Sequence, residues 1–394
     1  MRILDEKLVR GDITLLSQAW TDERSFCIRP ARSGVDEAWL EAALASLPVE
    51  FGSAHFALLT SGSTGRPKLV VANKSRSERL ARVLDEVQQS QGVEATVVTL
   101  PLSYCYALIN QWLWAHVMQR KLIMTNGLKA MPQLADVFAE QSAASVCLVG
   151  AQVRLLADGL RGRQFPGVIR VHFAGGPFPQ TALELVRDLF PNAAIYNNYG
   201  CTEAMPRLTL RHVDESEDPS IVGKPLPGIS MRSGSAGEIL FQSPYGAVGF
   251  VDEGAEYVAI SESDWVPSGD LGECLPDGMW KIHGRQGQVF KRFGEKISLS
   301  QVKDAIAQCW DGEINFYRED DPSGEAGHVL VLQPEPSETQ VRGVLKALRK
   351  AFPRTHWPLR VEGVSTLSLL PNGKIDAVRL AEESKKNIYW RQRL

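Results

Sequence analysis

The sequence lacks an excess of charge of either sign, and it lacks the composition of a disordered chain. Its 394 residues include 43 Lys and Arg against 46 Asp and Glu, a net charge of −3, which offers no field for generic binding of nucleic acid or an anionic membrane. Hydrophobic residues make up 44% and charged residues 23%, which excludes a mainly disordered chain. At roughly 150 residues per domain, this length predicts two or three globular domains.

Paired cysteines and long hydrophobic runs are also missing. No two of the six cysteines have the C-x-x-C spacing of a zinc or redox site. Residues 1–7 contain no apolar segment of the kind found in signal peptides. The longest apolar stretch, residues 104–118, is too short to cross a bilayer and contains polar side chains. We therefore expect a cytoplasmic protein with no membrane span and no nucleic-acid partner.

What the sequence does contain, from residue 56 to residue 196, is a regular alternation of short apolar runs and amphipathic stretches. The pattern predicts strands at 56–60, 95–100, 121–124, 145–149, 168–173 and 194–196, and helices at 75–90, 108–118, 131–141, 152–160 and 180–189. Alternation of this kind is typical of an α/β fold with a mostly parallel, doubly wound sheet.

The pattern changes twice further along the chain. After about residue 219, Gly and Pro become frequent and helical periodicity disappears, which predicts a small β-rich subdomain over about 219–283. Residues 284–394 again mix helices and strands and are expected to form an α+β C-terminal domain. The expected organisation is thus an N-terminal domain, 1–283, followed by a C-terminal domain, 284–394. The basic and aromatic tail, 385–394, is interpreted as a docked or frayed terminus.

The segment from Thr60 to Lys68 reads Thr-Ser-Gly-Ser-Thr-Gly-Arg-Pro-Lys and has the composition of a phosphate-binding loop. Glycine lets the backbone approach an anion closely, while the hydroxyls and the lysine supply further donors. The spacing is not that of a Walker A motif, and Leu69 stands where that motif requires Ser or Thr. A P-loop kinase or NTPase is therefore disfavoured, and an ordinary surface turn is the alternative that composition alone leaves open.

This segment resembles the signature loop of the adenylate-forming superfamily, which includes acyl- and aryl-CoA synthetases, peptide-synthetase adenylation domains and luciferase. Five further motifs of that superfamily follow in the same order, so the resemblance extends from about residue 56 to residue 376. They are Ala174-Gly-Gly-Pro177, Asn198-Tyr-Gly-Cys-Thr-Glu203, Ser268-Gly-Asp-Leu-Gly272, Gly284-Arg285 with Lys291 and Gly294, and Pro371-Asn-Gly-Lys-Ile-Asp376.

The resemblance implies a set of site residues. Those expected to bind ATP are Thr60, Ser61, Gly62, Ser63, Thr64, Gly65, Lys68, Gly175, Gly176, Pro177, Asn198, Tyr199, Gly200, Asp270 and Arg285. Lys68 and its loop would hold the β- and γ-phosphates, Tyr199 would stack on adenine and Asp270 would accept from the ribose hydroxyls.

The same resemblance assigns catalysis to Thr202, Glu203 and Lys374. Thr202 would donate to the α-phosphate and Glu203 would hold Mg²⁺. Lys374, on a C-terminal domain expected to be mobile, would reach the reacting carboxylate and α-phosphate as a point charge. The expected acid pocket is formed by Tyr104, Tyr106 and Ala174, and the thiol tunnel and domain hinge by Gly287, Lys291 and Gly294.

Three departures from the family pattern shape these expectations. The phosphate loop begins closer to the N-terminus than is usual, so we expect a shortened first lobe and raise the hypothesis of a homo-oligomer that covers the exposed face. Gly287 occupies a hinge position that commonly holds Asp or Lys. Tyr104 replaces a common histidine, and residues 101–107 lack the Asp that pairs with the ammonium group of an amino acid.

The sequence therefore predicts an AMP-forming carboxylic acid ligase that uses ATP and Mg²⁺. It would activate an aryl or acyl acid and pass the acyl group to the pantetheine thiol of CoA or of an acyl or peptidyl carrier protein. Two alternatives stay open, a catalytically inactive adenylate-binding protein and an amino-acid-activating adenylation enzyme.

Overall fold

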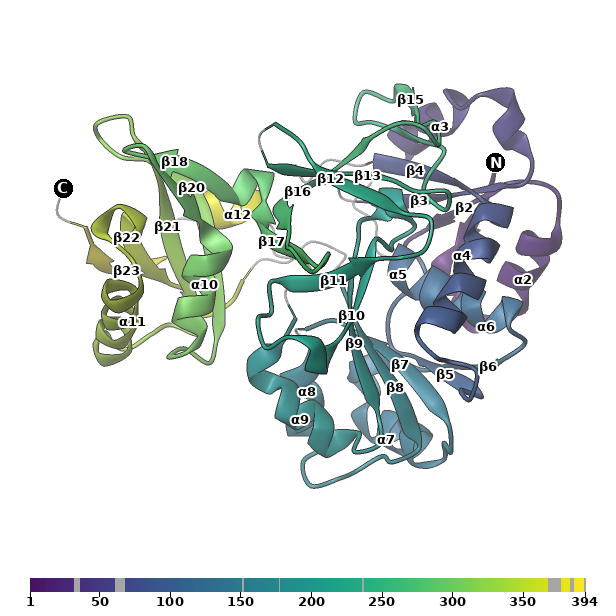
Figure 1. Ribbon diagram of the computed structural model, residues 1–394, viewed down its shortest axis with the longest axis horizontal. Helices are drawn as coiled ribbons and strands as arrows, with labels where there is room; N and C mark the ends of the chain where they lie inside the picture. Colours follow the sequence, from purple (N-terminus) through teal and green to yellow (C-terminus); the bar gives the residue numbers. More distant parts are fainter. Residues whose placement is uncertain are drawn as a thin grey trace. The chain divides into compact units, whose positions relative to one another are not determined.

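The computed structural model describes residues 1–31, 36–60, 68–150, 152–176, 178–235, 237–367, 377–382 and 386–392. The chain divides into two compact units, shown in Figure 1. The large unit comprises Met1–Ser268 and Gly272–Ile282, and the small unit comprises Gly269–Leu271 and His283–Leu394. No helix among the described residues is both long and apolar enough to cross a membrane.

The centre of the large unit is the parallel part of an 11-stranded sheet, in the order β9-β8-β7-β5-β6. The strands are β5 (Ala95–Val98), β6 (Lys121–Met124), β7 (Ala144–Leu148), β8 (Val168–Phe173) and β9 (Ala194–Tyr199). Strands β5 and β7 are buried throughout, because an inner parallel strand is covered on both faces, whereas β6, at the edge of the sheet, is only partly buried.

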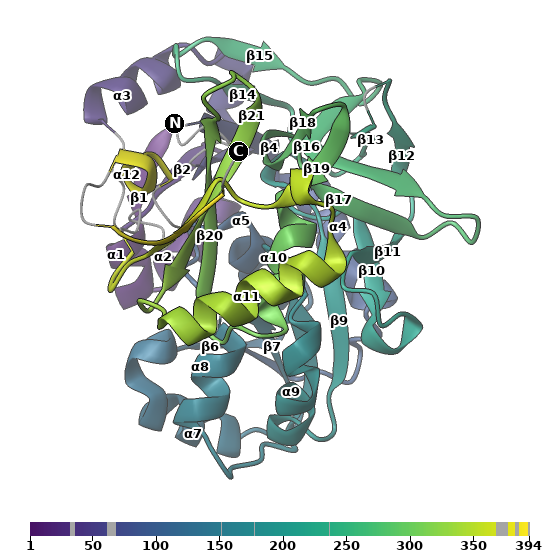
Figure 2. The same ribbon diagram turned by 90° about the vertical axis from the view of Figure 1, so that its left-hand side faces the viewer.

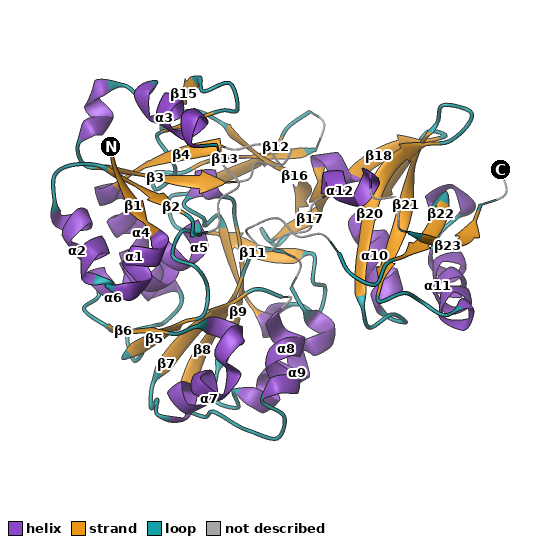
Figure 3. Ribbon diagram, turned by 180° about the vertical axis from the view of Figure 1, so that it is seen from behind, coloured by secondary structure: helices purple, strands orange, loops and turns teal. Residues whose placement is uncertain are grey.

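Helices cover both faces of these strands, as Figure 3 shows. One layer contains α7 (Met131–Ala139), α8 (Gln152–Gly159) and α9 (Leu183–Leu189); the other contains α4 (Lys74–Val87), α5 (Cys105–Ala107), the π-helix η2 (Leu108–Leu113) and α6 (Trp114–Val117). Each layer encloses its own hydrophobic cluster. The predicted doubly wound α/β lobe is confirmed.

The same sheet continues through antiparallel strands, in the order β12-β13-β16-β17-β11-β10. These are β10 (Thr209–His212), β11 (Ile221–Pro225), β12 (Ser230–Ser233), β13 (Glu238–Gln242), β16 (Val266–Cys274) and β17 (Trp280–Arg285). All of them except β10 lie in the segment of about 219–283, whose Gly- and Pro-rich sequence predicted a β-rich subdomain.

A second sheet, of six strands, contains the N-terminal part of the chain in the order β1-β2-β3-β4-β14-β15. Its strands are β1 (Arg2–Asp5), β2 (Phe26–Arg29), β3 (His55–Thr60), β4 (Lys68–Asn73), β14 (Gly249–Val251) and β15 (Tyr257–Ala259), accompanied by α1 (Glu6–Gly11), α2 (Thr14–Thr21) and α3 (Glu37–Ala45). Trp20 on α2 packs against Trp112 of η2 with ring centroids 5.3 Å apart, which joins this sheet to the main core.

The small unit is an α+β fold, as predicted. A hairpin of β18 (Val289–Arg292) and β19 (Glu295–Ser298) precedes a four-stranded sheet of β20 (Glu313–Asp320), β21 (Ala326–Gln333), β22 (Arg360–Gly363) and β23 (Asn387–Arg391). Its helices are α10 (Leu299–Ala307), α11 (Glu338–Ala351) and α12 (Ala377–Glu382), which Figure 2 labels. Helices α10 and α11 share one hydrophobic cluster with the sheet. The tail is docked, since β23 pairs with β22.

Short 3₁₀ turns complete the fold. They are η1 (Val49–Gly52), η3 (Gly127–Ala130), η4 (Gln180–Ala182), η5 (Thr202–Ala204), η6 (Val213–Glu215), η7 (Gln286–Gln288) and η8 (Arg354–His356).

Candidate active site

The two ends of the predicted phosphate loop are neighbours on paired strands. Strands β3 and β4 are antiparallel, and Thr60 at the end of β3 stands opposite Lys68 at the start of β4. The intervening residues that the resemblance assigns to phosphate binding, Ser61, Gly62, Ser63, Thr64 and Gly65, lie outside the described residues. Thr60 and Lys68 therefore lie side by side at one end of the β3–β4 pair.

The other predicted site residues of the large unit follow the carboxyl ends of two adjacent parallel strands. Ala174, Gly175 and Gly176 come directly after β8, and Gly200 and η5 come after β9, which pairs with β8. Gly175 has φ +83°, a conformation that a residue with a Cβ rarely adopts. Pro177 lies outside the described residues. Ligands of open α/β sheets bind at this end of the strands, so the topology supports the location.

Lys68 and Glu203, which are 135 residues apart in sequence, meet in the structure. The Lys68 Nζ lies 2.5 Å from the Glu203 Oε1 and 3.7 Å from the centroid of the Phe250 ring. Their side chains are 24% and 19% exposed, so each charge faces the other while keeping some access to solvent. The Glu203 carbonyl accepts a hydrogen bond from the Ala247 N–H at 2.8 Å, which anchors η5. Lys68, predicted to bind phosphate, and Glu203, predicted to bind the metal ion, therefore lie in direct contact.

The turn between Tyr199 and η5 is held by a close backbone approach. A Cβ on Gly200 would lie 2.0 Å from the Pro206 carbonyl oxygen, so only glycine fits there. The Leu208 N–H donates to the Tyr199 carbonyl at 2.8 Å on the other side of the turn. The Asn198 side chain is buried, and its amide donates to the Phe173 carbonyl at 2.9 Å. Asn198 thus links the ends of β8 and β9.

On the expected acid side, Tyr104 precedes α5 and Tyr106 lies within it. Burial raises the pKa of Tyr104 to about 12, with a smaller effect from the nearby Glu6 carboxylate. Glu6 is a buried residue that sequence analysis did not single out. Its carboxylate accepts from the Ser103 hydroxyl at 3.0 Å and from the Ala31 N–H at 2.9 Å, and so ties α1 to the segment before α5. A single Glu in a short polar N-terminal stretch carries no signal that would reveal this contact.

In the small unit, Asp270 and Arg285 form an ion pair. The Arg285 Nε lies 3.0 Å from the Asp270 Oδ1, and the aspartate side chain is 8% exposed. Gly269, which precedes Asp270 within β16, has φ +76°, a conformation that a residue with a Cβ rarely adopts. The structure therefore brings together the residues predicted to hold the ribose and to reinforce the grip on the nucleotide.

The predicted hinge and tunnel residues lie on neighbouring elements of the small unit. Gly287 is in η7, Lys291 is exposed on β18, and Gly294, at φ +82°, turns the β18–β19 hairpin. Lys374 lies outside the described residues.

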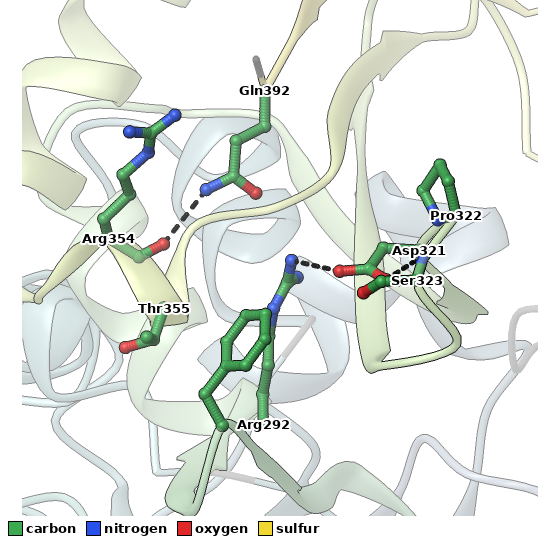
Figure 4. Close-up of a pocket in the computed structure, with 8 residues that line it drawn as sticks. Arg292, Asp321, Pro322, Ser323, Arg354, Thr355 and Gln392 are labelled. Atoms are coloured by element: carbon green, nitrogen blue, oxygen red, sulfur yellow. Dashed lines mark hydrogen bonds and ion pairs between the residues drawn. The ribbon is translucent and has the colours of Figure 1, made fainter. Parts of the chain in front are cut away.

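A cavity of about 540 Å³ opens beside the β18–β19 hairpin (Figure 4). Its lining residues are Arg292, Phe293, Asp321, Pro322, Ser323, Arg354, Thr355 and Gln392. Arg292 donates to the Asp321 carboxylate at 3.0 Å, and the Gln392 amide donates to the Arg354 carbonyl at 3.1 Å. The buried Arg292–Asp321 pair braces the strand that carries Lys291.

Comparison with known proteins agrees with this arrangement. The family model described as "AMP-binding enzyme" matches residues 26–245. A D-alanine–D-alanyl carrier protein ligase of Staphylococcus haemolyticus is 22% identical over 350 residues, which cover 83% of this chain and 71% of that protein. A hybrid PKS-NRPS synthetase of Botryobasidium botryosum is 25% identical over 358 residues, covering 83% of this chain and 20% of that protein.

Solved structures share the fold. The o-succinylbenzoate CoA synthetase of Bacillus subtilis in complex with AMP superposes with a TM-score of 0.73 at 16% identity, covering 98% of this chain and 83% of that one. The anthranilate CoA ligase AuaEII in complex with anthranoyl-AMP superposes with a TM-score of 0.71 at 15% identity, covering 96% and 77%.

These findings confirm the resemblance to adenylate-forming enzymes and the predicted class of ATP-dependent, AMP-forming acid–thiol ligase. The individual site residues stay predictions. Since the family model covers more than half of the sequence, the chain belongs to the family of AMP-binding enzymes.

Proposed function

We propose that this protein activates a small aryl or acyl carboxylic acid as its adenylate and transfers the acyl group to a pantetheine thiol. The observation that carries the proposal is the contact of Lys68 with Glu203 beside the carboxyl ends of β8 and β9. A phosphate-binding cation and a carboxylate at one place suit a nucleotide whose phosphate charge must be balanced during the reaction.

In the first step, a carboxylate oxygen of the acid attacks the α-phosphorus of ATP. A new O–P bond forms, the bond from the α-phosphorus to the bridging oxygen of the β-phosphate breaks, and pyrophosphate leaves. Lys68 would balance charge on the leaving group, and Thr202 would donate to the α-phosphate. In the second step, the thiol sulfur attacks the acyl carbon, AMP leaves, and the thiol proton passes to solvent.

Glu203 is suited to hold Mg²⁺. No cluster of three or more His, Cys, Asp or Glu side chains able to hold a metal is present in the described segments. Mg²⁺ commonly takes only one or two carboxylates and completes its coordination with phosphate oxygens and water, so a single carboxylate at the phosphate site fits. A bound Mg²⁺ would neutralise phosphate charge, and the Glu203–Lys68 contact would give way to contacts with ATP.

The acceptor is either free CoA or the same thiol on a carrier protein. Similar proteins include a carrier-protein ligase and CoA synthetases, which supports a pantetheine thiol in both cases. Gly294 and Lys291, on the β18–β19 hairpin, are the residues proposed to line its path.

Amino-acid activation is the second candidate, and the sequence similarity to D-alanine–D-alanyl carrier protein ligases favours it. The acid side of the site argues against it. Residues 101–107 contain no Asp, and the buried Glu6 carboxylate already accepts hydrogen bonds from Ser103 and Ala31. An ammonium group would moreover approach the buried guanidinium of Arg207, which packs 5.6 Å from the Tyr106 ring.

Pyrophosphate release tests the proposal. The full chain would be incubated with ATP, Mg²⁺ and a panel of benzoates, cinnamates, graded fatty and dicarboxylic acids and amino acids. We expect acid-dependent formation of AMP and pyrophosphate. Binding of ATP without release of pyrophosphate for any acid would favour the inactive adenylate-binding alternative, and formation of ADP and phosphate would contradict the reaction class.

Lys374→Ala tests the assignment of the reacting lysine. Because loss of one group that stabilises transition-state charge costs about 10²-fold or more in rate, the variant should lose most adenylation while calorimetry still detects ATP binding. Lys346→Ala, which removes an exposed lysine of α11, is the matched control and should keep full activity. Equal activity of Lys374→Ala and its parent would remove this lysine from the mechanism.

A further inference from the structure

A group of buried polar side chains lies under the carboxyl ends of the parallel strands. We call it the buried polar cluster; its members are Tyr106, Asn110, Cys147, His172, Asn198 and Arg207. Arg207 donates through Nε to the Asn110 Oδ1 at 2.6 Å, and its guanidinium lies 5.6 Å from the Tyr106 ring centroid. Cys147 and His172 are register partners on β7 and β8. Sequence analysis predicted Tyr106 and Asn198 as site residues but did not predict that the other four members join them.

Its position relates it directly to the candidate active site. Cys147, His172 and Asn198 are each the penultimate residue of their strand, β7, β8 and β9 respectively. Asn198 is itself a predicted nucleotide residue; Tyr199, also predicted to bind the nucleotide, follows it directly, and Ala174 of the predicted acid pocket comes two residues after His172. At about 3.3 Å per residue, the cluster lies roughly 7 Å deeper along the strands than Ala174. It is therefore placed where the far end of an acid held at the strand ends would lie.

The guanidinium of Arg207 is incompletely bonded. Its residue is 1% exposed, and both Nη1 and Nη2 are buried without a hydrogen-bond partner in the described part of the chain. The Nδ1 of His172 is in the same condition. Buried polar groups in native proteins are nearly always satisfied, so two free terminal nitrogens on one buried cation require an explanation.

Arg211 and Arg292 are buried as deeply, and each also has two guanidinium nitrogens without a partner among the described residues, but both differ from Arg207 in having an acidic neighbour. Arg292 contacts the Asp321 carboxylate at 3.0 Å. Burial lowers the pKa of Arg211, and the nearby carboxylates of Glu215 and Asp218 offset part of this lowering. For Arg207, burial lowers the pKa to about 10, and the groups that offset this effect are Tyr106 and Cys147, neither of which is a carboxylate. Within the described ranges, Arg207 is therefore the buried arginine that no carboxylate offsets.

We propose that Arg207 selects the acid, and that the substrate is a dicarboxylate whose second carboxylate is received by Nη1 and Nη2 of this residue. Because Nε is already used by Asn110, the two terminal nitrogens remain as a fork, and a carboxylate matches such a fork with two parallel hydrogen bonds. The inference rests on the proposed function, since it assumes that the first carboxylate is adenylated at the strand ends. The depth of the cluster favours a diacid of benzene-dicarboxylate size or its acyl equivalent.

Matched acids provide the test. The kcat/KM for pyrophosphate release would be measured for benzene dicarboxylates and for four- to six-carbon diacids, each against the monoacid in which a methyl group replaces the second carboxylate. We expect at least one diacid to exceed its partner by about 10²-fold or more, since a site built to hydrogen-bond a group strongly rejects analogues that lack it. Turnover of monoacids without any diacid preference would overturn the assignment and leave the proposed function standing.

Variants of Arg207 distinguish a role in selecting the acid from a role in folding. Arg207→Met should reduce the diacid preference to below about tenfold while monoacid turnover persists, and Arg207→Lys, which keeps the charge but not the fork, should lose at least about tenfold of the preference. Arg211→Met removes an equally buried arginine and should leave the preference unchanged. An unchanged preference in Arg207→Lys would also overturn the assignment.

Binding without turnover is measured independently. The best diacid should raise the melting temperature of the parent protein in the absence of ATP and fail to do so for Arg207→Lys. Such a shift without any pyrophosphate release would support Arg207 as the anchor and contradict the proposed reaction. Absence of both the shift and the release would overturn both proposals.

Discussion

The contact between Lys68 and Glu203 yields a quantitative prediction about the stability of the large unit. At 2.5 Å and an effective dielectric constant of about 20, the Coulomb attraction of a unit pair is about 7 kcal/mol. Dehydration of the two charges offsets most of this attraction. A hydrogen bond to a charged group retains about 1.5–3 kcal/mol, and both side chains remain partly exposed, so we expect a coupling free energy of about 2 kcal/mol.

A double-mutant cycle measures this coupling. The variants are Lys68→Met, Glu203→Gln and the combination, and urea unfolding of the ATP-free protein is followed by the fluorescence of tryptophans in the large unit. Each single variant should lose stability, and the double variant should lose about 2 kcal/mol less than the sum of the two.

The control cycle uses Arg76 and Glu262, an ion pair of similar length in the same unit. Its separation is 2.8 Å, but the Glu262 side chain is 56% exposed. Exposed pairs contribute about 0.2–1 kcal/mol, so its coupling should be clearly smaller. If the Lys68–Glu203 coupling were below about 0.5 kcal/mol, or no larger than that of the control, the electrostatic reasoning for the site would be refuted.

Two further predictions concern His328 and Gly200. His328 is fully buried with both ring nitrogens unbonded among the described residues, and burial lowers its pKa to about 3. An unfolded His titrates at about 6.5, so the contribution of His328 to the free energy of unfolding is fully present above that pH. As the pH drops from there toward 3, the free energy of unfolding should fall by up to about 1.4 kcal/mol per pH unit. In urea unfolding, His328→Phe should flatten this pH dependence, and equal pH dependences of the variant and its parent would contradict the assignment. Gly200→Ala would place a Cβ 2.0 Å from the Pro206 carbonyl, so we expect thermal unfolding to show a loss of about 1–3 kcal/mol, with reduced adenylation. Gly176→Ala, where nothing lies within 4 Å, should change stability by less than about 0.5 kcal/mol, and equal losses in the two variants would argue against the steric explanation.

Local patterns predicted most elements of the parallel sheet because each strand is a short, continuous apolar run. The strands at 121–124 and 168–173 have the predicted bounds. Strand β4 was missed because its apolar residues directly follow the phosphate loop and were not separated from it. The N-terminal strands β1 and β2 have only four residues each, and their pairing with one another and with β3 joins segments far apart in sequence.

The sequence by itself determined the family, the α/β class and the order of the motifs, because these depend on residue types at short spacings. It also placed Lys68 and Glu203 in separate motifs with separate roles. Only the tertiary structure decided that these two side chains share one ion pair, since strand pairing brings together residues 135 positions apart.

The burial of Arg207 and Glu6 was likewise decided only by the tertiary structure. Charged residues are usually exposed, so residue type gives no sign that these two are buried; their contacts with Asn110 of η2 and with Ser103, respectively, form only in the folded chain. Whether a buried charge is satisfied depends on every element that surrounds it, and that information is absent from any local stretch of the chain.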